Sequence, residues 1–257
     1  MRIARFTHEN EIHYGTVHGE PGDETLQYLT GDPLYVGVQE LDRTVDVSEA
    51  RLLAPVIPRS KIVCVGRNYA DHAREMGNDV PTRPLLFFKP NTAVSGPGDP
   101  VTLPSWTEEV SYEAELAVVI GRMCKDVPVE RVPEVVFGYT AANDLTARDA
   151  QRTDGQWARA KGFDGACPLG PWIETELDTS ALSVRSSVNG ELKQDGNTED
   201  MIFDVPTLVS YVTEAFTLLP GDVILTGTPA GVGTVDDGDR LSVDVEGIGE
   251  LTTVLRR

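Results

Sequence analysis

Two glutamates at the entrance of an apolar segment are the residues best placed to do chemistry. Glu113 and Glu115 precede a run of Leu, Ala, Val and Ile that ends at Gly121, a pattern typical of a buried strand. Residues two apart on a strand point to the same face, so the two carboxylates should converge. Because buried anions repel each other unless a cation neutralises them, the pattern favours an oxygen-ligated metal. A strand with one solvated polar face has the same spacing.

A histidine and a glutamate form a second candidate pair. His72 and Glu75 are three residues apart in a segment, residues 67–77, that we expect to form a short helix ending at Gly77. This spacing makes the two side chains neighbours on one helix face. A carboxylate beside an imidazole orients the ring and raises its basicity, which is the usual preparation of a general base. A solvated His/Glu pair would show the same spacing.

Three further features could complete a site. An expected strand over residues 138–144 ends in Asp144, and Lys161, one of five lysines, lies in a Gly-flanked loop where it could equally be a surface residue. Residues 227–233 form a Gly-rich segment whose backbone N–H groups could hold a carboxylate or an oxyanion. Three carboxylates with no cluster of thiols or imidazoles suit Mg²⁺ or Mn²⁺, with Ca²⁺ less favoured. Such a cation, with open positions, stabilises an enolate or a 1,2-dicarbonyl.

The elements that must position these residues are mostly short strands, so we expect a mainly β (α+β) chain. Strands are expected at residues 3–6, 12–17, 34–38, 61–66, 85–90, 138–144, 184–188, 191–194, 223–226, 240–245 and 250–255. Helices are expected at residues 128–137 and 205–216, and Asn189-Gly190 predicts a two-residue hairpin turn. Residues 1–56 should form a small N-terminal β domain, joined by a Pro-containing linker to a larger domain over residues 57–257.

The charge balance excludes several classes of partner. The chain has 41 Asp and Glu against 22 Lys and Arg, a net charge of −19, and the acids are spread along its whole length. So anionic a surface disfavours nucleic acid and anionic lipid. No apolar run approaches the length of a membrane span, and the N-terminus lacks signal-peptide features, so a cytoplasmic location is expected. Cys64, Cys124 and Cys167 are expected to be buried free thiols.

The acidic surface also predicts that salt stabilises the fold. Self-repulsion of a net charge of −19 destabilises the compact state unless salt screens it, so we infer a halophilic source. Melting curves recorded from low to molar KCl should show a rising midpoint. A midpoint that stays flat or falls with KCl would contradict this inference.

Five segments, in this order, resemble the fumarylacetoacetate hydrolase (FAH) family. They are Gly66-Arg-Asn-Tyr-Ala-Asp-His-Ala-Arg-Glu-Met76, Ser111-Tyr-Glu-Ala-Glu-Leu116, Asn143-Asp-Leu-Thr-Ala-Arg-Asp-Ala-Gln151, Ala160-Lys-Gly-Phe-Asp-Gly165 and Leu225-Thr-Gly-Thr-Pro-Ala-Gly-Val-Gly233. The match runs from about residue 60 to the end, and the first 56 residues depart from the shortest family members. The resemblance implies an FAH-type mixed β-sandwich roll, usually a homodimer, with Mg²⁺ or Mn²⁺ in each subunit.

The resemblance also implies roles for single residues. Glu113, Glu115 and Asp144 match the family's metal ligands. His72 and Glu75 match the water-activating dyad of the acylpyruvase and oxaloacetate decarboxylase branch, and Lys161 matches a lysine that binds substrate oxygens. The candidates for substrate contacts are Gln151 and Thr228, which match family positions, and Arg67 and Tyr69, which lie in the same segment as His72.

The implied activity is a metal-dependent hydrolysis of a C–C bond in acylpyruvates or related β-diketo acids. Decarboxylation of oxaloacetate needs the same metal chelation but no attacking water. One alternative is an isomerase or decarboxylase of 2-hydroxyhepta-2,4-diene-1,7-dioate-type dienoates from aromatic degradation. Another is an inactive carboxylate- or metal-binding protein on the same fold, because fold alone does not determine function.

Overall fold

Twenty strands dominate the computed structural model, which describes residues 1–257. The strands are β1 Arg2–His8, β2 Glu11–His18, β3 Thr25–Leu29, β4 Glu40–Asp46, β5 Arg51–Leu53, β6 Ile62–Gly66, β7 Leu85–Lys89, β8 Val94–Ser95, β9 Pro100–Thr102, β10 Val110–Tyr112, β11 Ala114–Ile120, β12 Val136–Asn143, β13 Thr146–Ala147, β14 Cys167–Glu174, β15 Ser183–Val188, β16 Glu191–Asn197, β17 Val223–Leu225, β18 Gly233–Val235, β19 Arg240–Val245 and β20 Gly249–Arg256. The helices are α1 Pro33–Val36, α2 Ala70–Glu75, α3 Arg148–Thr153, α4 Ala158–Lys161 and α5 Val205–Ala215. Short 3₁₀ turns are η1 Val47–Glu49, η2 Asn91–Ala93, η3 Val129–Glu134 and η4 Thr198–Asp200.

Strand β11 lies inside the largest sheet, whose strand order is β4-β3-β2-β1-β14-β12-β11-β17-β6-β7. Every residue of β11 is buried, because apolar cores cover both of its faces. Even-numbered side chains such as Leu116 and Val118 join one core, and Ala117 and Val119 join the other. Burial on both faces explains why the segment is continuously apolar instead of alternating.

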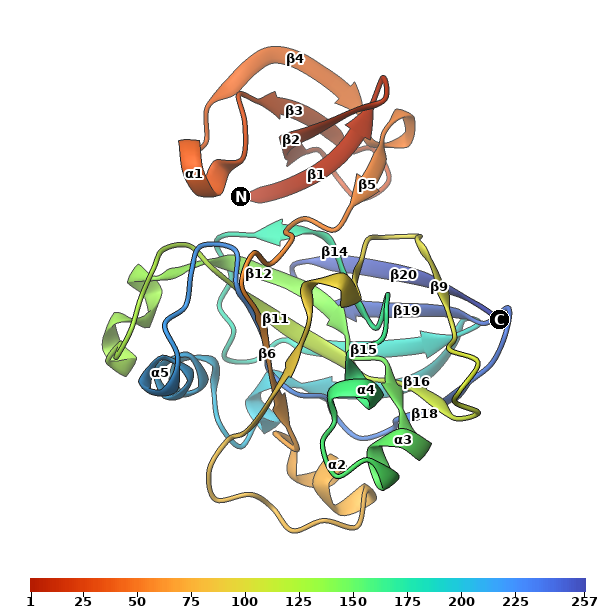
Figure 1. The fold of residues 1–257 in the computed structure, drawn as a ribbon. Coiled ribbons are helices and arrows are strands. Elements are labelled where there is room, and N and C mark those ends of the chain that lie inside the picture. The colour runs from red at the N-terminus through yellow and green to blue at the C-terminus, as the bar shows by residue number, and fades with distance from the viewer.

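The other two sheets and helix α5 provide those cores. A five-stranded sheet in the order β16-β15-β19-β20-β9 contributes Val184 and Val243 to the same core as Val118, and α5 adds Leu208 and Val212 to it. A three-stranded sheet in the order β13-β10-β18 lies next to the start of β11. Figure 1 shows the five-stranded sheet and α5 in the larger body of the molecule.

The N-terminal strands β1–β5 stand above this body as a small unit (Figure 1). Backbone hydrogen bonding nevertheless continues into the large sheet, because β1 pairs with β14 at Arg2↔Glu174 and Ile3↔Ile173. The division of the chain after residue 56 therefore stays a prediction.

Two expected elements were wrong. Residues 34–38 are not a strand, because Asp32 caps helix α1 by accepting a hydrogen bond from the Leu34 N–H (3.0 Å) and Pro33 occupies the first turn. Residues 128–137 are not an α-helix: the 3₁₀ turn η3 contains Pro133, which cannot donate to a helical ladder, and β12 already begins at Val136.

The expectations for the last helix, one hairpin turn, the strand content and the cysteines were confirmed. Helix α5 begins after Asp204, whose carboxylate caps the Thr207 N–H (2.9 Å). The β15–β16 hairpin turns at Asn189-Gly190, both with positive φ, as the turn requires. The chain is mainly β, and its three cysteines are free and buried. None of its helices combines the length and the apolar character needed to cross a membrane.

Candidate active site

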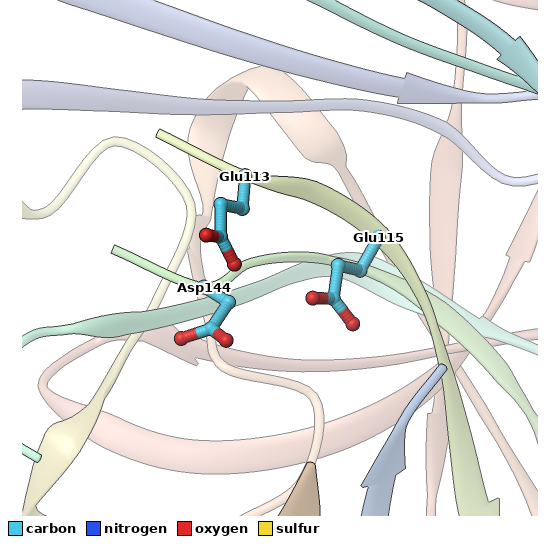
Figure 2. A group of neighbouring side chains, drawn as sticks. All are labelled: Glu113, Glu115 and Asp144. Atoms are coloured by element: carbon cyan, nitrogen blue, oxygen red, sulfur yellow. The ribbon is translucent and has the colours of Figure 1, made fainter. Parts of the chain in front are cut away.

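Three buried carboxylates meet at the start of β11. Glu113 lies just before β11 and Glu115 within it, and Asp144 directly follows β12. The two strands pair with Ala114 opposite Asn143, and the Asp144 N–H donates to the Glu113 carbonyl (2.9 Å). One oxygen from each carboxylate lies within 4.8 Å of the other two. Figure 2 shows the three side chains converging, as strand alternation predicts for the two glutamates.

Three buried cations balance the three carboxylates. Lys161 Nζ lies 2.8 Å from Glu113 Oε2 and 2.7 Å from Asp144 Oδ2. An Arg148 guanidinium nitrogen lies 2.6 Å from Glu113 Oε1, and Lys89 Nζ lies 2.7 Å from Asp144 Oδ1. With all three carboxylates ionised, the formal charges of the cluster cancel, which limits the cost of burying it.

The pairing separates the acidities of the two glutamates. Burial would raise the pKa of Glu113, but the Lys161 and Arg148 cations outweigh burial and lower it. The pKa of Glu115 is raised well above its ordinary value by burial and by repulsion from Asp144 and Glu113. Its one hydrogen bond comes from the Gly227 N–H (2.6 Å). Burial would lower the pKa of Lys161, yet Asp144 and Glu113 raise it.

Lys89 was missed in the sequence, where it reads only as the end of an apolar strand. Its ammonium is fully buried and donates to the carbonyls of Lys161, Ala166 (2.8 Å) and Leu145 (3.3 Å). Because all three protons are used in this way, the contact with Asp144 Oδ1 is an ion pair without hydrogen-bond geometry. The scarcity of lysine in the chain was the one available signal.

The donor set fits a hard divalent cation. Carboxylate oxygens are the ligands that Mg²⁺ and Mn²⁺ prefer, and no thiolate or imidazole joins the group that could hold an ion. Asp144 Oδ1 is a buried acceptor that receives no hydrogen bond, so it has lone pairs to offer. Glu113, Glu115 and Asp144 could therefore hold such an ion.

A cavity of about 280 Å³ opens onto the carboxylates, and His72 lies on its wall. The imidazole Nδ1 is 3.3 Å from Glu75 Oε2, and both oxygens of that carboxylate accept from the Gly231 N–H (3.1 and 3.2 Å). His72 is buried while Glu75 is partly exposed. The pair expected on α2 is thus anchored to the Gly-rich segment 227–233.

Of the four residues expected to contact substrate, three line the cavity and one does not. Arg67, Gln151 and Thr228 line the cavity, and Gln151 accepts a hydrogen bond from Arg148 (2.9 Å). The cavity wall also includes Arg148, Arg152 and Trp157. Tyr69 is buried but is not part of the wall, and its hydroxyl has no hydrogen-bond partner. Burial raises the pKa of that hydroxyl.

Comparison with known families identifies the larger part of the chain. Residues 61–256 match the family described as fumarylacetoacetate (FAA) hydrolase C-terminal. The chain belongs to the fumarylacetoacetate hydrolase family. Residues 1–55 match a second family, described as Rv2993c-like, N-terminal. The mixed β architecture described above is accordingly the FAH fold, as the sequence resemblance implied.

Relatives of this FAH-family chain carry several different names. Protein Rv2993c of Mycobacterium tuberculosis is 46% identical, covering 100% of this chain and 98% of its own length. The human mitochondrial oxaloacetate tautomerase FAHD1 is 43% identical, covering 74% of this chain and 89% of its own. A crystal structure named 5-carboxymethyl-2-hydroxymuconate delta-isomerase, from Mycobacterium smegmatis, is 45% identical with a TM-score of 0.93 and covers 100% of both chains. The names thus support an enzyme of the FAH family without assigning one reaction.

Proposed function

We propose that this chain is a divalent-metal-dependent hydrolase that cleaves a C–C bond in acylpyruvates, with His72 as the general base. The observation that carries the proposal is the placement of His72 on the wall of the carboxylate-lined cavity, with Nδ1 held by Glu75. The Gly231 N–H fixes Glu75 in turn. An imidazole held through Nδ1 has Nε2 available for proton transfer.

Glu113, Glu115 and Asp144 would hold Mg²⁺ or Mn²⁺. When bound, the ion supplies Lewis-acid polarisation of the substrate's oxygen atoms. The carboxylates and the three buried cations cancel formally, so a divalent ion would leave the cluster with an excess of positive charge. That excess suits an anionic oxo acid, although the chain as a whole carries a net charge of −19. Lys161, at the centre of the cluster, is the residue that we assign to the substrate's oxygens.

In this proposal His72 takes a proton from water, and the resulting hydroxide attacks the distal carbonyl of the acylpyruvate. Glu75 stabilises the imidazolium that forms. The bond between the acyl carbon and C3 then breaks, and its electron pair goes to C3, which accepts the proton back from His72. Water thus supplies the hydroxyl of the released carboxylic acid and one hydrogen of pyruvate.

A second candidate is tautomerisation of a 2-oxo dicarboxylate, in which His72 takes its proton from C3 instead of from water and the C2 oxygen then accepts that proton to give the enol. Two observations favour it: the relative named oxaloacetate tautomerase, and one arginine without an acidic partner, Arg67, on the cavity wall. Arg148 and Arg152 already pair with Glu113 and Glu109, whereas Arg67 has no acidic partner. Arg67 could therefore receive a second substrate carboxylate, which acetylpyruvate lacks. Isomerisation of a dienoate, the reaction class in the name of one structural neighbour, would also use His72 as the base in this chain.

An ultraviolet assay with acetylpyruvate, oxaloacetate and 2-hydroxyhepta-2,4-diene-1,7-dioate side by side separates these reactions. The protein would be loaded with Mn²⁺ and kept in molar KCl. We expect acetylpyruvate to yield pyruvate and acetate, with turnover lost on adding EDTA and restored by Mn²⁺. Turnover of enol-oxaloacetate or the dienoate without any acetylpyruvate cleavage would favour the second candidate, and no turnover of the three would contradict both.

A further inference from the structure

Gln194, in strand β16, is completely buried beside the carboxylate strand although it carries a polar amide. Its Oε1 accepts from the Ala114 N–H (2.9 Å) and from the Ser186 hydroxyl (2.8 Å). Its Nε2 donates to the Thr228 hydroxyl and to the Pro229 carbonyl, both at 2.8 Å. The Ala114 N–H can only donate and the Pro229 carbonyl can only accept, so the amide has one consistent orientation. All four of its hydrogen-bonding positions are occupied.

A closed ring of hydrogen bonds results. The Thr228 hydroxyl, which accepts from Gln194, gives its own proton to the Ala114 carbonyl (2.8 Å). Both backbone groups of Ala114 are thereby held by two side chains that also bind each other. The Ala114 N–H belongs to the peptide after Glu113, and its C=O belongs to the peptide before Glu115. The ring therefore fixes both peptide planes between the two glutamates.

The ring forms on the edge of β11 that faces β17, because β17 does not extend as far as Ala114. Strand β17 pairs with β11 only at Ala117–Val119, and the last backbone bond on that edge joins the Thr226 N–H to the Leu116 carbonyl (3.1 Å). Beyond it the chain turns away, so the buried N–H and C=O of Ala114 need other partners. Gln194 and Thr228 supply them.

A glycine allows β16 to come close enough. A Cβ atom at Gly196 would lie 2.4 Å from the Pro229 Cβ, so any larger residue would separate β16 from the segment that carries Thr228. Only glycine, which has no Cβ, permits β16 to lie this close to Pro229.

We propose that Gln194 and Thr228 form a clamp, made of these two side chains and the Ala114 backbone, that fixes the geometry of Glu113 and Glu115 for metal binding. Gln194 is a positioning residue, and the Thr228 hydroxyl works in the clamp instead of binding substrate. Its single proton is committed to the Ala114 carbonyl, so it has none to donate to a ligand. The inference rests on the metal site of the proposed function, but not on the reaction.

The test measures Mn²⁺ affinity of the full-length protein, stripped with EDTA and dialysed, by the electron paramagnetic resonance signal of free Mn²⁺. Thr228→Val and Gln194→Met remove the clamp without changing charge. Thr228→Ser keeps the hydroxyl. Thr213→Val is the matched control, because Thr213 is also fully buried, accepts one N–H (Val127, 3.0 Å) and donates to one carbonyl (Ser210, 2.8 Å), but lies on α5.

We expect Thr228→Val and Gln194→Met each to weaken Mn²⁺ binding by about 10- to 100-fold, the range typical of residues that orient metal ligands. The double variant should bind Mn²⁺ no more weakly than the single variant with the lower affinity, because the two substitutions break the same ring. Thr228→Ser should bind nearly as the wild type does, and Thr213→Val should lose thermal stability with its Mn²⁺ affinity unchanged.

The inference is overturned if folded Thr228→Val binds Mn²⁺ as tightly as the wild type and loses only affinity for oxalate, a probe of the substrate's oxygens. That result would make Thr228 a substrate ligand. If Gln194→Met does not fold, Thr228→Val alone decides the matter, since it is isosteric and breaks the same ring. A wild-type protein that binds no Mn²⁺ would instead refute the metal assignment itself. If the wild type is active and both variants keep its Mn²⁺ affinity, only the clamp is refuted.

Discussion

Glu113→Gln is expected to abolish Mn²⁺ binding and reduce turnover to the background rate. Glutamine keeps the shape of the side chain but removes the charge, and it turns one ligand oxygen into a donor that repels a cation. Lys161 and Arg148 would also lose the carboxylate that they share (2.8 and 2.6 Å), so the cluster would carry an unbalanced positive charge. Loss of the ion's electrostatic stabilisation alone should lower kcat by at least about 10²- to 10³-fold.

Calorimetric titration of metal-free protein with Mn²⁺, followed by the acetylpyruvate assay, checks this prediction. Glu134→Gln is a matched control, because it breaks an Arg–Glu pair with Arg131 (2.8 Å) that lies on the surface. Surface pairs of this kind contribute little, so the control should bind metal and turn over normally. If Glu113→Gln bound Mn²⁺ and reacted like the wild type, the carboxylate cluster could not be the metal site.

His72→Asn is expected to remove catalysis while leaving metal binding intact. The imidazole lies on the cavity wall, but it is not among the carboxylates that could hold the ion. Loss of a positioned general base usually costs about 10²- to 10⁴-fold in rate. We therefore expect kcat to fall within this range and the Mn²⁺ dissociation constant to stay unchanged. Glu75→Gln should cause a smaller loss: an amide oxygen at the position of Oε2 can still accept from both His72 and the Gly231 N–H and so orient the ring, but it carries no charge to stabilise the imidazolium.

The chain contains a natural control for this experiment. His18 also faces a glutamate, Glu40, at 3.5 Å, but its side chain is 57% exposed. His18→Asn should leave kcat and Mn²⁺ affinity as in the wild type. Steady-state kinetics and Mn²⁺ titration of both variants make the comparison. Retained activity in His72→Asn would exclude His72 as the base under both candidate reactions, since each takes its proton through this ring.

Local pattern was enough to predict the side-chain placements of the candidate site that depend on single elements. Strand alternation placed Glu113 and Glu115 on one face, and three-residue spacing placed His72 beside Glu75. The same reasoning found α5 and the Asn189-Gly190 turn, because helical periodicity and positive φ are local properties. It failed at residues 34–38, where an apolar segment looked like a strand but capping by Asp32 and the fixed φ of Pro33 favoured a helix.

Only the tertiary structure revealed the buried polar residues that contact the candidate site from distant parts of the chain. Lys89 ends an apolar strand, and Gln194 sits in an ordinary hairpin strand, so neither stands in a local pattern that marks it as functional. Lys89 contacts Asp144, which lies 55 residues away in the chain, and Gln194 contacts Ala114, which lies 80 residues away. Periodicity reports which face of an element is apolar. It carries no information on which donors and acceptors from remote segments come into contact once the elements pack. Those contacts decide whether the fold tolerates a buried charge or amide, because an unpartnered one is costly.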